Sequence, residues 1–222
     1  HPVKGTPIIK RLLNSVESLF RHPAIIVGYK ADEVMAALGD AYTYIHQSEQ
    51  LGTGHALSCA KEVLEKEGYD NIVVVPGDHP LISAQTLEKL LHPHTEEQAK
   101  VSLAIVSVPN FFEDFSGFSH CGRIIRDDEN NVSGIVEFKD ASEEERKIGE
   151  VNVSYYCFDA AWLWKNIEKL GSENAAKEFY LTDMVKVARE QGEKVASFVI
   201  ENPFEGLGIN DREQLERVEN HC

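Results

Sequence analysis

The sequence is poor in the features that mark secreted, membrane-embedded and redox-active proteins. It holds four cysteines in 222 residues, and no two of them form a Cys-x-x-Cys pair, so neither a zinc site nor a redox dithiol is indicated. Widely scattered cysteines are typical of free thiols in a reducing compartment, and we therefore expect a cytoplasmic protein. Apolar runs such as Ile72–Pro76 are far too short to span a bilayer, and the first four residues, His1–Lys4, lack the apolar core of a signal peptide.

Basic residues are also scarce. The chain carries 22 Lys and Arg against 37 Asp and Glu, which gives a formal net charge of −15 at pH 7. Duplex binding needs clustered cations that displace counterions, so nucleic acid is excluded as a partner. A small polyanion remains possible as a ligand if local cations, helix amino termini or a metal ion offset its charge. The alternative is that the acidity serves only solubility.

The length and composition are those of one soluble domain. The chain has 42% hydrophobic and 27% charged residues, and 222 residues are enough for a well-packed α/β core. It contains no internal repeat, low-complexity tract or long linker, so we expect a single domain over residues 1–222. A start at His1 rather than Met predicts that this domain is incomplete at its amino end.

Short apolar runs alternate with segments whose apolar residues recur at helical spacing. The runs predict strands at residues 24–28, 42–46, 71–75 and 101–108, and the periodic segments predict helices at 8–20, 32–38, 53–68 and 84–91. Thr6 and Ser83 stand at two of the helix starts as expected N-caps. Strands that alternate with helices indicate a mainly parallel sheet covered on both faces.

The middle of the chain breaks this alternation. Residues 123–126 and 132–138 are strand-like and are joined by the polar turn 127–131, which predicts an antiparallel hairpin. A further strand is expected at 151–158. After it we expect helices, one more strand and a last helix that starts at Asp211. The predicted fold is α/β: a mixed, mainly parallel sheet flanked by helices, with an antiparallel hairpin insertion.

Asp78 is the first candidate for chemistry. It follows the apolar run Ile72–Pro76 at the point where a buried strand should end. Ligands of open parallel sheets bind beyond the carboxyl ends of the strands. Mg²⁺ prefers one or two carboxylates together with phosphate oxygens of a substrate, so Asp78 suits a metal site. The alternative is a turn aspartate that caps the next segment, and the pattern leaves both open.

The segment Gln47–Ala56 is the most unusual in composition. Its glycines, Gly52 and Gly54, allow close approach of the backbone to a flat ligand. Gln47 and Gln50 each carry donors and acceptors, as the edge of a nucleobase requires. The segment is neither a P-loop nor a full G-x-G-x-x-G fingerprint, and the alternative is a simple glycine turn into a helix.

Seven segments, spread over nearly the whole chain, occur in the order and spacing of one known family. They are Gln47–Ala56, Gly77–Leu81, Cys121–Ile124, Ile135–Asp140, Glu150–Asn152, Glu178–Asp183 and Gly208–Arg212. On these segments the chain resembles the bacterial N-acetylglucosamine-1-phosphate uridylyltransferases, the amino-terminal half of a bifunctional enzyme that also acetylates glucosamine-1-phosphate. Any one motif is weak, but seven in register are specific.

The resemblance implies a Rossmann-like nucleotidyltransferase fold and the reaction of UTP with N-acetylglucosamine-1-phosphate. The products would be pyrophosphate and UDP-N-acetylglucosamine, a precursor of peptidoglycan. The uridine side of the pocket would be lined by Gln47, Gln50, Gly52 and Thr53. The N-acetylglucosamine would contact Gly122, Glu137 and Asn152. The catalytic Mg²⁺ would be held by Asp78 and Asn210, and both side chains offer the hard oxygen ligands that this ion prefers.

The chain departs from the family at both ends. The glycine-rich L-x-x-G-x-G-T-R-M loop and the lysine that follows it are absent before the segment at His1–Val3. The family's β-helix acetyltransferase repeats are absent after Cys222. We therefore expect the chain to be nearly inactive and less stable without its upstream strand and loop. No feature indicates an oligomeric state.

Two other functions remain open. A metal-dependent glycosyltransferase of related fold usually shows an Asp-x-Asp pair, whereas His79 and Pro80 follow Asp78 here. A non-catalytic sugar-nucleotide-binding or regulatory module is supported by the missing loop. From their positions alone, without the family resemblance, the exposed face of a hairpin is the favoured place for Glu137 and Asn152. Glu178–Asp183 is left out of the site because it fits the start of a helix, and His92–His94 is expected at a helix end on the surface.

Overall fold

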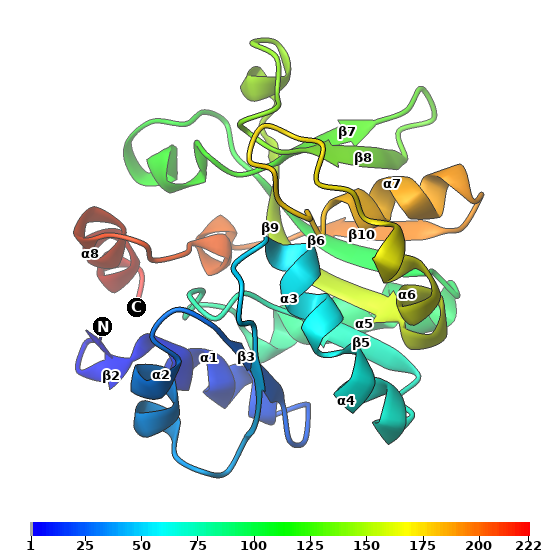
Figure 1. The fold of residues 1–222 in the computed structure, drawn as a ribbon. Helices are drawn as coiled ribbons and strands as arrows, with labels where there is room; N and C mark the ends of the chain where they lie inside the picture. The colour runs from blue at the N-terminus through cyan, green and yellow to red at the C-terminus, as the bar shows by residue number, and fades with distance from the viewer. Residues whose placement is uncertain (1) are drawn as a thin grey trace.

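A six-stranded sheet runs through the centre of the computed structural model, which describes residues 2–222 (Figure 1). Its strands, in spatial order, are β10 (Val195–Val199), β6 (Val101–Ser107), β9 (Glu150–Asp159), β7 (Arg123–Arg126) and β8 (Val132–Val136), with β5 (Asn71–Val74) also paired to β9. β10 and β6 are parallel, while β9 is antiparallel to β5, β6 and β7. The predicted α/β class and mixed sheet are confirmed.

The antiparallel hairpin is confirmed as β7 and β8, with Arg123 opposite Val136. The sheet contains fewer parallel strand pairs than the alternation of strands and helices predicted. β5, β6, β7 and β10 point the same way, but β9 returns in the opposite direction and pairs with three of them. The direction of β9 depends on long-range pairing after the hairpin, which local periodicity does not record.

Two small sheets flank the large one. β3 (Ala24–Val27) is parallel to β4 (Thr43–His46), and α2 (Ala31–Leu38) connects them. β1 (Pro2–Val3) and β2 (Thr6–Pro7) form a short hairpin before α1 (Ile8–Glu17). The expected N-cap at Thr6 is wrong, because Thr6 pairs within this hairpin and α1 starts after Pro7 without a side-chain cap.

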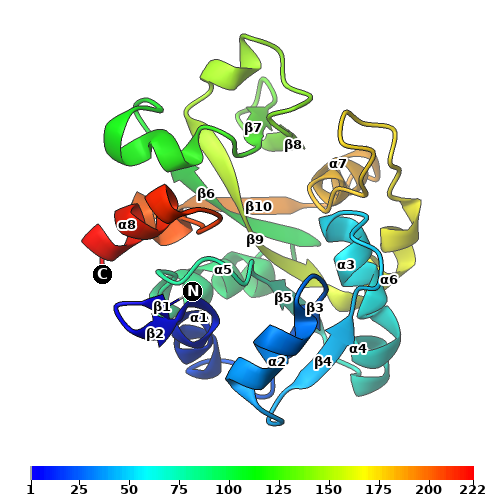
Figure 2. The same ribbon diagram turned by 60° about the vertical axis from the view of Figure 1, so that its left-hand side comes forward.

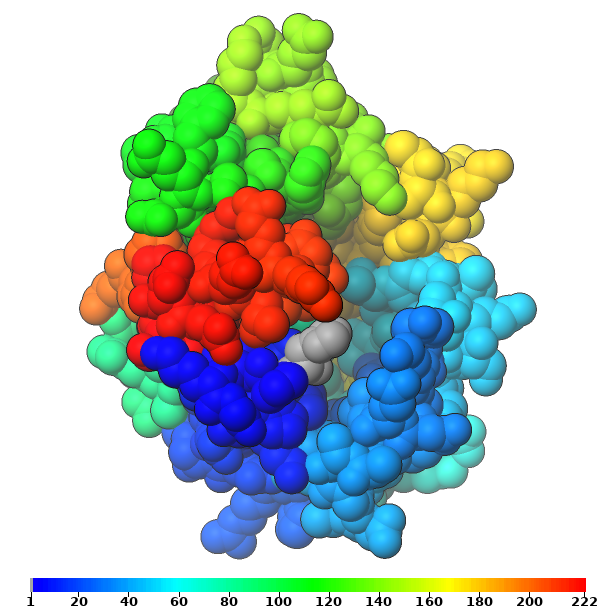
Figure 3. Space-filling model, turned by 90° about the vertical axis from the view of Figure 1, so that its left-hand side faces the viewer, coloured from blue at the N-terminus to red at the C-terminus, as the bar shows by residue number. Residues whose placement is uncertain are grey.

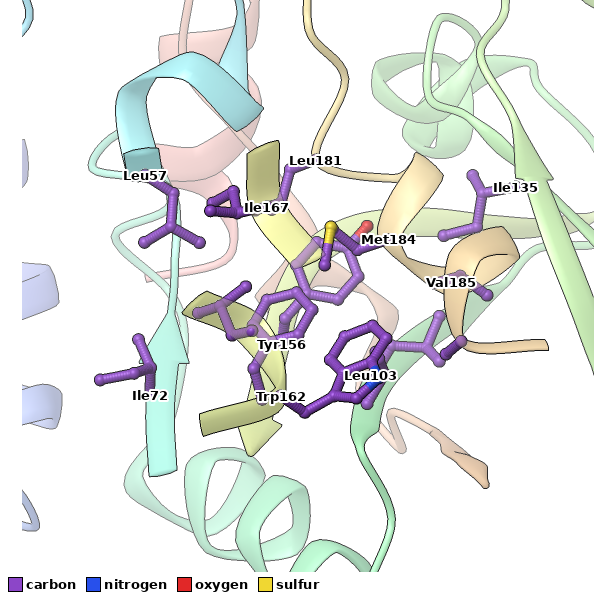
Figure 4. Close-up of a cluster of buried hydrophobic side chains, with 14 of the residues drawn as sticks. Leu57, Ile72, Leu103, Ile135, Tyr156, Trp162, Ile167, Leu181, Met184 and Val185 are labelled. Carbon is purple, nitrogen blue, oxygen red and sulfur yellow. The ribbon is translucent and has the colours of Figure 1, made fainter. Parts of the chain in front are cut away.

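Helices cover both faces of the six-stranded sheet (Figure 2). One face packs against α3 (Thr53–Cys59), α6 (Ala160–Asn166) and α7 (Asp183–Glu190), and the other against α1, α5 (Ala84–Glu96) and α8 (Arg212–Asn220). Alternate residues of β9 serve the two cores: Tyr156 lies among Leu57, Trp162 and Met184 (Figure 4), while Tyr155 belongs to the other core. The result is a three-layer α/β sandwich.

Several helix boundaries differ from expectation. Ser83 caps α5 by accepting a hydrogen bond from the Thr86 amide at 3.1 Å, as predicted. α5 extends past its expected end at Leu91 and contains Pro93, so His94 is buried and its Nδ1 lies 3.1 Å from the Ser102 hydroxyl. The expectation of surface histidines there is wrong for His94. The helix predicted over 53–68 is divided at Ala60 into α3 and α4 (Lys61–Glu67).

The two ends of the described chain lie against each other (Figure 3). The Lys4 amide donates to Glu219 at 2.9 Å, and its ammonium donates to the Cys222 carbonyl oxygen at 3.0 Å. The four cysteines are free thiols. Within residues 2–222, no helix has the length and apolar character that crossing a bilayer requires.

Candidate functional site

The turn between β4 and α3 is shaped by Gly52. Its φ of +106° is a conformation that side chains disfavour. A Cβ at this position would lie 2.7 Å from the Phe179 carbonyl oxygen and 2.9 Å from Cβ of Glu178, so the two segments touch backbone to backbone. Glycine is required here both by the dihedral angle and by the close approach.

The same turn is hydrogen-bonded to the segment that precedes α7. The Phe179 amide donates to the Leu51 carbonyl oxygen, and the Gly54 amide donates to the Phe179 carbonyl oxygen, both at 2.8 Å. The Leu181 amide donates to the Thr53 hydroxyl at 3.1 Å. Thr53, a predicted uridine-side residue, therefore anchors the turn to residues 179–181.

The two glutamines of the turn converge at the end of β3. Gln47 Nε2 donates to the Gly52 carbonyl oxygen at 3.0 Å, and Gln50 Nε2 donates to the Gln47 carbonyl oxygen at 3.1 Å. A Cβ on Gly28 would lie 3.0 Å from Gln50 Nε2 and 3.7 Å from Gln47 Oε1. The structure thus brings Gln47, Gln50, Gly52 and Thr53 into one turn beside Gly28.

Gly122, Glu137 and Asn152 also come together. The backbone N–H of Asn152 donates to the Gly122 carbonyl oxygen at 2.9 Å. A Cβ on Gly122 would lie 3.3 Å from Glu137 Oε2, so the absence of a side chain leaves the carboxylate room. The three residues that the family resemblance assigns to the sugar therefore lie on adjacent segments of the large sheet.

The Asn152 side chain is held in a fixed orientation. Its Oδ1 accepts hydrogen bonds from the Tyr156 hydroxyl at 2.8 Å and the Ser154 amide at 3.1 Å. Ser154 has a φ of +61°, and the β6–β9 register shifts near this point, as in a β-bulge that redirects side chains. Asn152 is only 5% exposed, so the alternative of an exposed hairpin face is wrong for this residue.

Glu137 is partly buried and is bonded to Thr182. The Thr182 hydroxyl donates to Glu137 Oε1 at 3.0 Å. Burial raises the pKa of Glu137; the Thr182 hydrogen bond opposes this rise, while the charges of Asp183 and Asp140 add to it. The carboxyl group is therefore easier to protonate than an exposed glutamate.

Residues 178–182 link the two halves of the site, although sequence reasoning left this segment out. Phe179 and Leu181 bond the glutamine turn, and Thr182 bonds Glu137. α7 begins at Asp183, so the segment does lead into a helix, but its own contacts are with both predicted subsites. Only the family motif around Glu178–Asp183 carried a signal for this role.

Asp78 and Asn210 are brought close by backbone pairing. Asp78 lies in the turn after β5, and its carbonyl oxygen accepts from the Ile209 amide at 3.1 Å. A Cβ on Gly208 would lie 3.0 Å from Asp78 Oδ2, so glycine leaves that carboxylate oxygen uncovered. Asn210 is the next residue after Ile209, exposed and ahead of α8.

His79 fixes the Asp78 turn against β9. The Tyr155 hydroxyl donates to the Glu205 carbonyl oxygen at 2.6 Å, so its oxygen accepts from His79 Nδ1–H at 3.0 Å. Burial lowers the pKa of His79, and the nearby Asp78 charge partly opposes this. A neutral imidazole thus braces the turn that presents Asp78.

The donor set fits Mg²⁺ with substrate oxygens completing its shell. Across residues 2–222, no three His, Cys, Asp or Glu side chains converge in a way that could hold a metal. The Asp78 carboxylate and the Asn210 amide oxygen are hard ligands, and Mg²⁺ is usually held by one or two protein carboxylates plus phosphates. The uncovered oxygen beside Gly208 is the observation that supports such a site.

Arg123 is a structural residue of the site that sequence reasoning did not assign. It is 1% exposed and lies under the Phe111 ring at 4.3 Å. Its guanidinium donates to the carbonyl oxygens of Ser119 and Arg146 at 2.9 and 3.2 Å. It therefore organises the loop that ends at Gly122, and nothing in the sequence marks this arginine as buried.

Two cavities lie near these residues. One of about 490 Å³ is lined by Glu137 together with Asp140, Tyr180 and Asp183. The other, of about 500 Å³, is lined by residues of α1, β3 and β5. Of the predicted site residues, Glu137 alone lines the first cavity, and none lines the second.

Comparison with known proteins is consistent with this geometry. Residues 1–178 match the family model of the MobA-like NTP transferase domain. The chain is 42% identical over 221 residues to "Bifunctional protein GlmU" of Brevibacillus brevis, covering 99% of this chain and 46% of that protein. It is 40% identical over 220 residues to the protein of the same name from Bacillus subtilis (strain 168), with the same shares covered. The chain thus spans about half the length of the curated relatives it matches.

Proposed function

The chain belongs to the MobA-like NTP transferase family, and from that premise we propose that it transfers a uridylyl group from UTP to N-acetylglucosamine-1-phosphate. The products are UDP-N-acetylglucosamine and pyrophosphate. The single observation that carries the proposal is the convergence of Gly122, Glu137 and Asn152, tied through Thr182 to the glutamine turn. The similarity of the chain to the two GlmU proteins, at 42% and 40% identity, supports the same reaction.

The glutamine turn receives the uridine in this proposal. The side-chain amides of Gln47 and Gln50 lie beside Gly28, where no side chain blocks a flat base, and together they offer an acceptor from Gln47 and a donor from Gln50. Gly52 and Thr53 hold the turn in place through the contacts with residues 178–181. The uridine side is therefore defined by a rigid backbone with two polar side chains.

The sugar lies against the bulge of β9. The Glu137 carboxylate accepts hydrogen bonds from sugar hydroxyls, and the Asn152 amide nitrogen donates to the N-acetyl group or a hydroxyl. Oδ1 of Asn152 is already bonded twice, so Nδ2 is the atom left to contact the ligand; one of its hydrogens faces Ser154 Oγ at 3.3 Å. Gly122 keeps the approach to Glu137 open.

Asp78 and Asn210 hold the metal, which we propose is Mg²⁺. When bound, this ion neutralises charge on the phosphates around the reacting phosphorus. The phosphate oxygen of the sugar is already anionic at neutral pH, so the reaction needs no general base from the protein. The chain's own contribution is to orient the two substrates for in-line attack.

Residues 1–222 form one sugar-1-phosphate nucleotidyltransferase domain in this proposal, acting on small molecules in the cytoplasm. The alternative function of a metal-dependent glycosyltransferase is not supported, because the matched family is that of an NTP transferase domain. A non-catalytic binding module would have the same pocket, so turnover has to be measured separately from binding.

Calorimetry with UDP-N-acetylglucosamine on residues 1–222 tests the ligand class. We expect binding that strengthens when Mg²⁺ replaces EDTA. Asp78→Ala should remove this Mg²⁺ dependence, since it deletes the charged ligand; a contact to a charged group contributes about 1.5–3 kcal/mol, or roughly 10- to 150-fold in affinity.

Asp128→Ala is the matched control, because Asp128 is an exposed aspartate of the hairpin turn. It should bind as the wild type does. No binding of UDP-N-acetylglucosamine at millimolar concentration, or an unchanged Mg²⁺ dependence in Asp78→Ala, would contradict the proposal.

A further inference from the structure

His55 contacts the Gln47 side chain, and the proposed function gives it no role. Gln47 Nε2 lies 3.0 Å from the Gly52 carbonyl oxygen and 3.1 Å from His55 Nδ1. The other ring nitrogen, His55 Nε2, lies 3.9 Å from Cys59 Sγ. The ring also packs against Phe179, with 6.4 Å between centroids.

These contacts determine the direction of each hydrogen bond. A backbone carbonyl oxygen only accepts, so the Gln47 atom beside Gly52 must be the amide nitrogen. That NH₂ group has two hydrogens, and the second meets His55 Nδ1, which therefore accepts. A neutral imidazole then carries its hydrogen on Nε2, where it faces the weak acceptor Cys59 Sγ.

The carbonyl oxygen of the Gln47 amide is left on the opposite side. Among residues 2–222, no donor is bonded to Gln47 Oε1, and no buried side-chain nitrogen or oxygen lacks a partner. Oε1 is therefore accessible. It lies beside Gly28, where even an added Cβ would remain 3.7 Å away. The amide thus presents an acceptor, and only an acceptor, to the space beside Gly28.

We propose that His55 is a specificity-determining positioning residue, which locks the Gln47 amide so that the site prefers uracil over cytosine. This inference rests on the proposed function, in which Gln47 meets the base. Uracil has an N–H donor at ring position 3, which an amide oxygen accepts. Cytosine has a lone pair at the same position, which an amide oxygen repels.

The test compares the binding of UMP and CMP to residues 1–222 by calorimetry. His55→Leu removes the acceptor at Nδ1, whereas His55→Asn places an amide oxygen near the same point. Cys59→Ala is the matched control, because it removes only the contact at the other ring nitrogen. Thermal unfolding of each variant checks that the fold is kept.

We expect the wild type to bind UMP more tightly than CMP. His55→Leu should weaken UMP binding roughly 2- to 13-fold, which corresponds to the loss of one neutral hydrogen bond. It should also bring the ratio of UMP affinity to CMP affinity closer to one. His55→Asn should restore the ratio, and Cys59→Ala should leave it unchanged. A ratio in His55→Leu equal to that of the wild type overturns the inference.

Nitrogen-15 NMR of the His55 ring separates this inference from the proposed function. We expect an unprotonated Nδ1, a hydrogen on Nε2, and altered Gln47 amide signals in His55→Leu. A hydrogen on Nδ1 overturns the inference even if UMP binds well. If neither UMP nor CMP binds, the proposed function is contradicted. The NMR result still decides whether His55 orients Gln47.

Discussion

The region around β7, β8 and β9 and the region around β3 and β4 differ in how completely they are packed. In the first, Asn152 and Tyr156 are buried and hydrogen-bonded to each other, and Arg123 is enclosed beneath Phe111. In the second, β3 consists of four apolar residues, Ala24–Val27, of which only Val27 is buried.

The difference lies in strand pairing. Among the described strands, β3 pairs with β4 alone and β5 pairs with β9 alone, and residues of both β3 and β5 line the cavity of about 500 Å³. Apolar side chains and free strand edges facing an open cavity lose both burial and ladder hydrogen bonds. The side proposed to bind the sugar is therefore the pre-organised half, and the β3–β4 side is the half that extra structure would stabilise most.

The largest expected effect comes from supplying that structure. We predict that a longer chain, carrying an apolar strand and a glycine-rich loop ahead of His1, is more stable and turns over at least ~10³-fold faster than residues 1–222. The strand would pair between β3 and β5, and several loop donors would stabilise the triphosphate, each oxyanion contact contributing about 2.7–4 kcal/mol. Pyrophosphate release from UTP and N-acetylglucosamine-1-phosphate in excess Mg²⁺ measures the difference.

Comparable activity of residues 1–222 and the longer chain would contradict this prediction. Another cationic segment would then have to serve the triphosphate, and Lys4, Lys10 and Arg11 are the nearest in sequence. Two of these are already engaged: Lys4 bonds Cys222, and Arg11 Nε donates to the Val3 carbonyl oxygen at 3.2 Å. Because these side chains are already hydrogen-bonded within the protein, we expect the longer chain to have the higher turnover rate.

A smaller effect is expected from Asn152→Ala on the packed side. Loss of one buried hydrogen-bonding partner costs about 1–3 kcal/mol, so affinity for UDP-N-acetylglucosamine should fall roughly 5- to 150-fold. Affinity for UMP should change far less, because Asn152 is proposed to contact the sugar and not the base. Calorimetry with UDP-N-acetylglucosamine, UDP-glucose and UMP makes the measurement.

Tyr156→Phe is the control for that substitution. It removes the same hydrogen bond to Asn152 Oδ1 but keeps the Asn152 amide nitrogen. If Asn152 contacts the sugar, Tyr156→Phe should weaken sugar binding less than Asn152→Ala. Equal losses for all three ligands in Asn152→Ala would refute the role assigned to this residue.

The same division shows how far the sequence could predict the molecule. Local signals mostly succeeded where structure is local, although the cap expected at Thr6 is wrong. Ser83 caps its helix as predicted, the last helix begins just after Asp211, and the polar turn after Arg126 joins two antiparallel strands. The motifs around Gln47 and Asp78 identified turns at strand ends because glycine and polar residues interrupt apolar runs there. These features depend on neighbours within a few residues.

Long-range features were not predictable in this way. The direction of β9, the burial of His94 and the enclosure of Arg123 depend on partners outside the local segment, which no periodicity records. Ser102 lies 8 residues from His94 in the chain, and Phe158 of β9 pairs with Val101, 57 residues earlier. The link through Thr182 was missed for the same reason, since Glu137 lies 45 residues earlier.

The smallest predicted effect is a pH dependence confined to the packed side. Burial, the first cause, raises the pKa of Glu137 above its ordinary value, so the folded state binds a proton more readily than the unfolded state. Its contribution to stability is fully present below the unfolded pKa and is lost as the pH rises through the folded pKa. Glu137→Gln should remove this loss, because a neutral amide is not penalised by burial.

We therefore expect Glu137→Gln to match the wild type in stability at acidic pH and to exceed it at neutral pH. The gain should be at most about 1 kcal/mol, or about 2–4 °C in Tm for a chain of this size, because Thr182 partly compensates the buried charge. Glu143→Gln is the control, since Glu143 is exposed and should show no such change. Hydrogen exchange would locate the effect: protection should change with pH in β7 and β8 but not in β3 and β4. A stability gain that is independent of pH, or one shared by Glu143→Gln, would show that burial does not destabilise the charged form of Glu137. The contrast between the two regions would then rest on strand pairing alone.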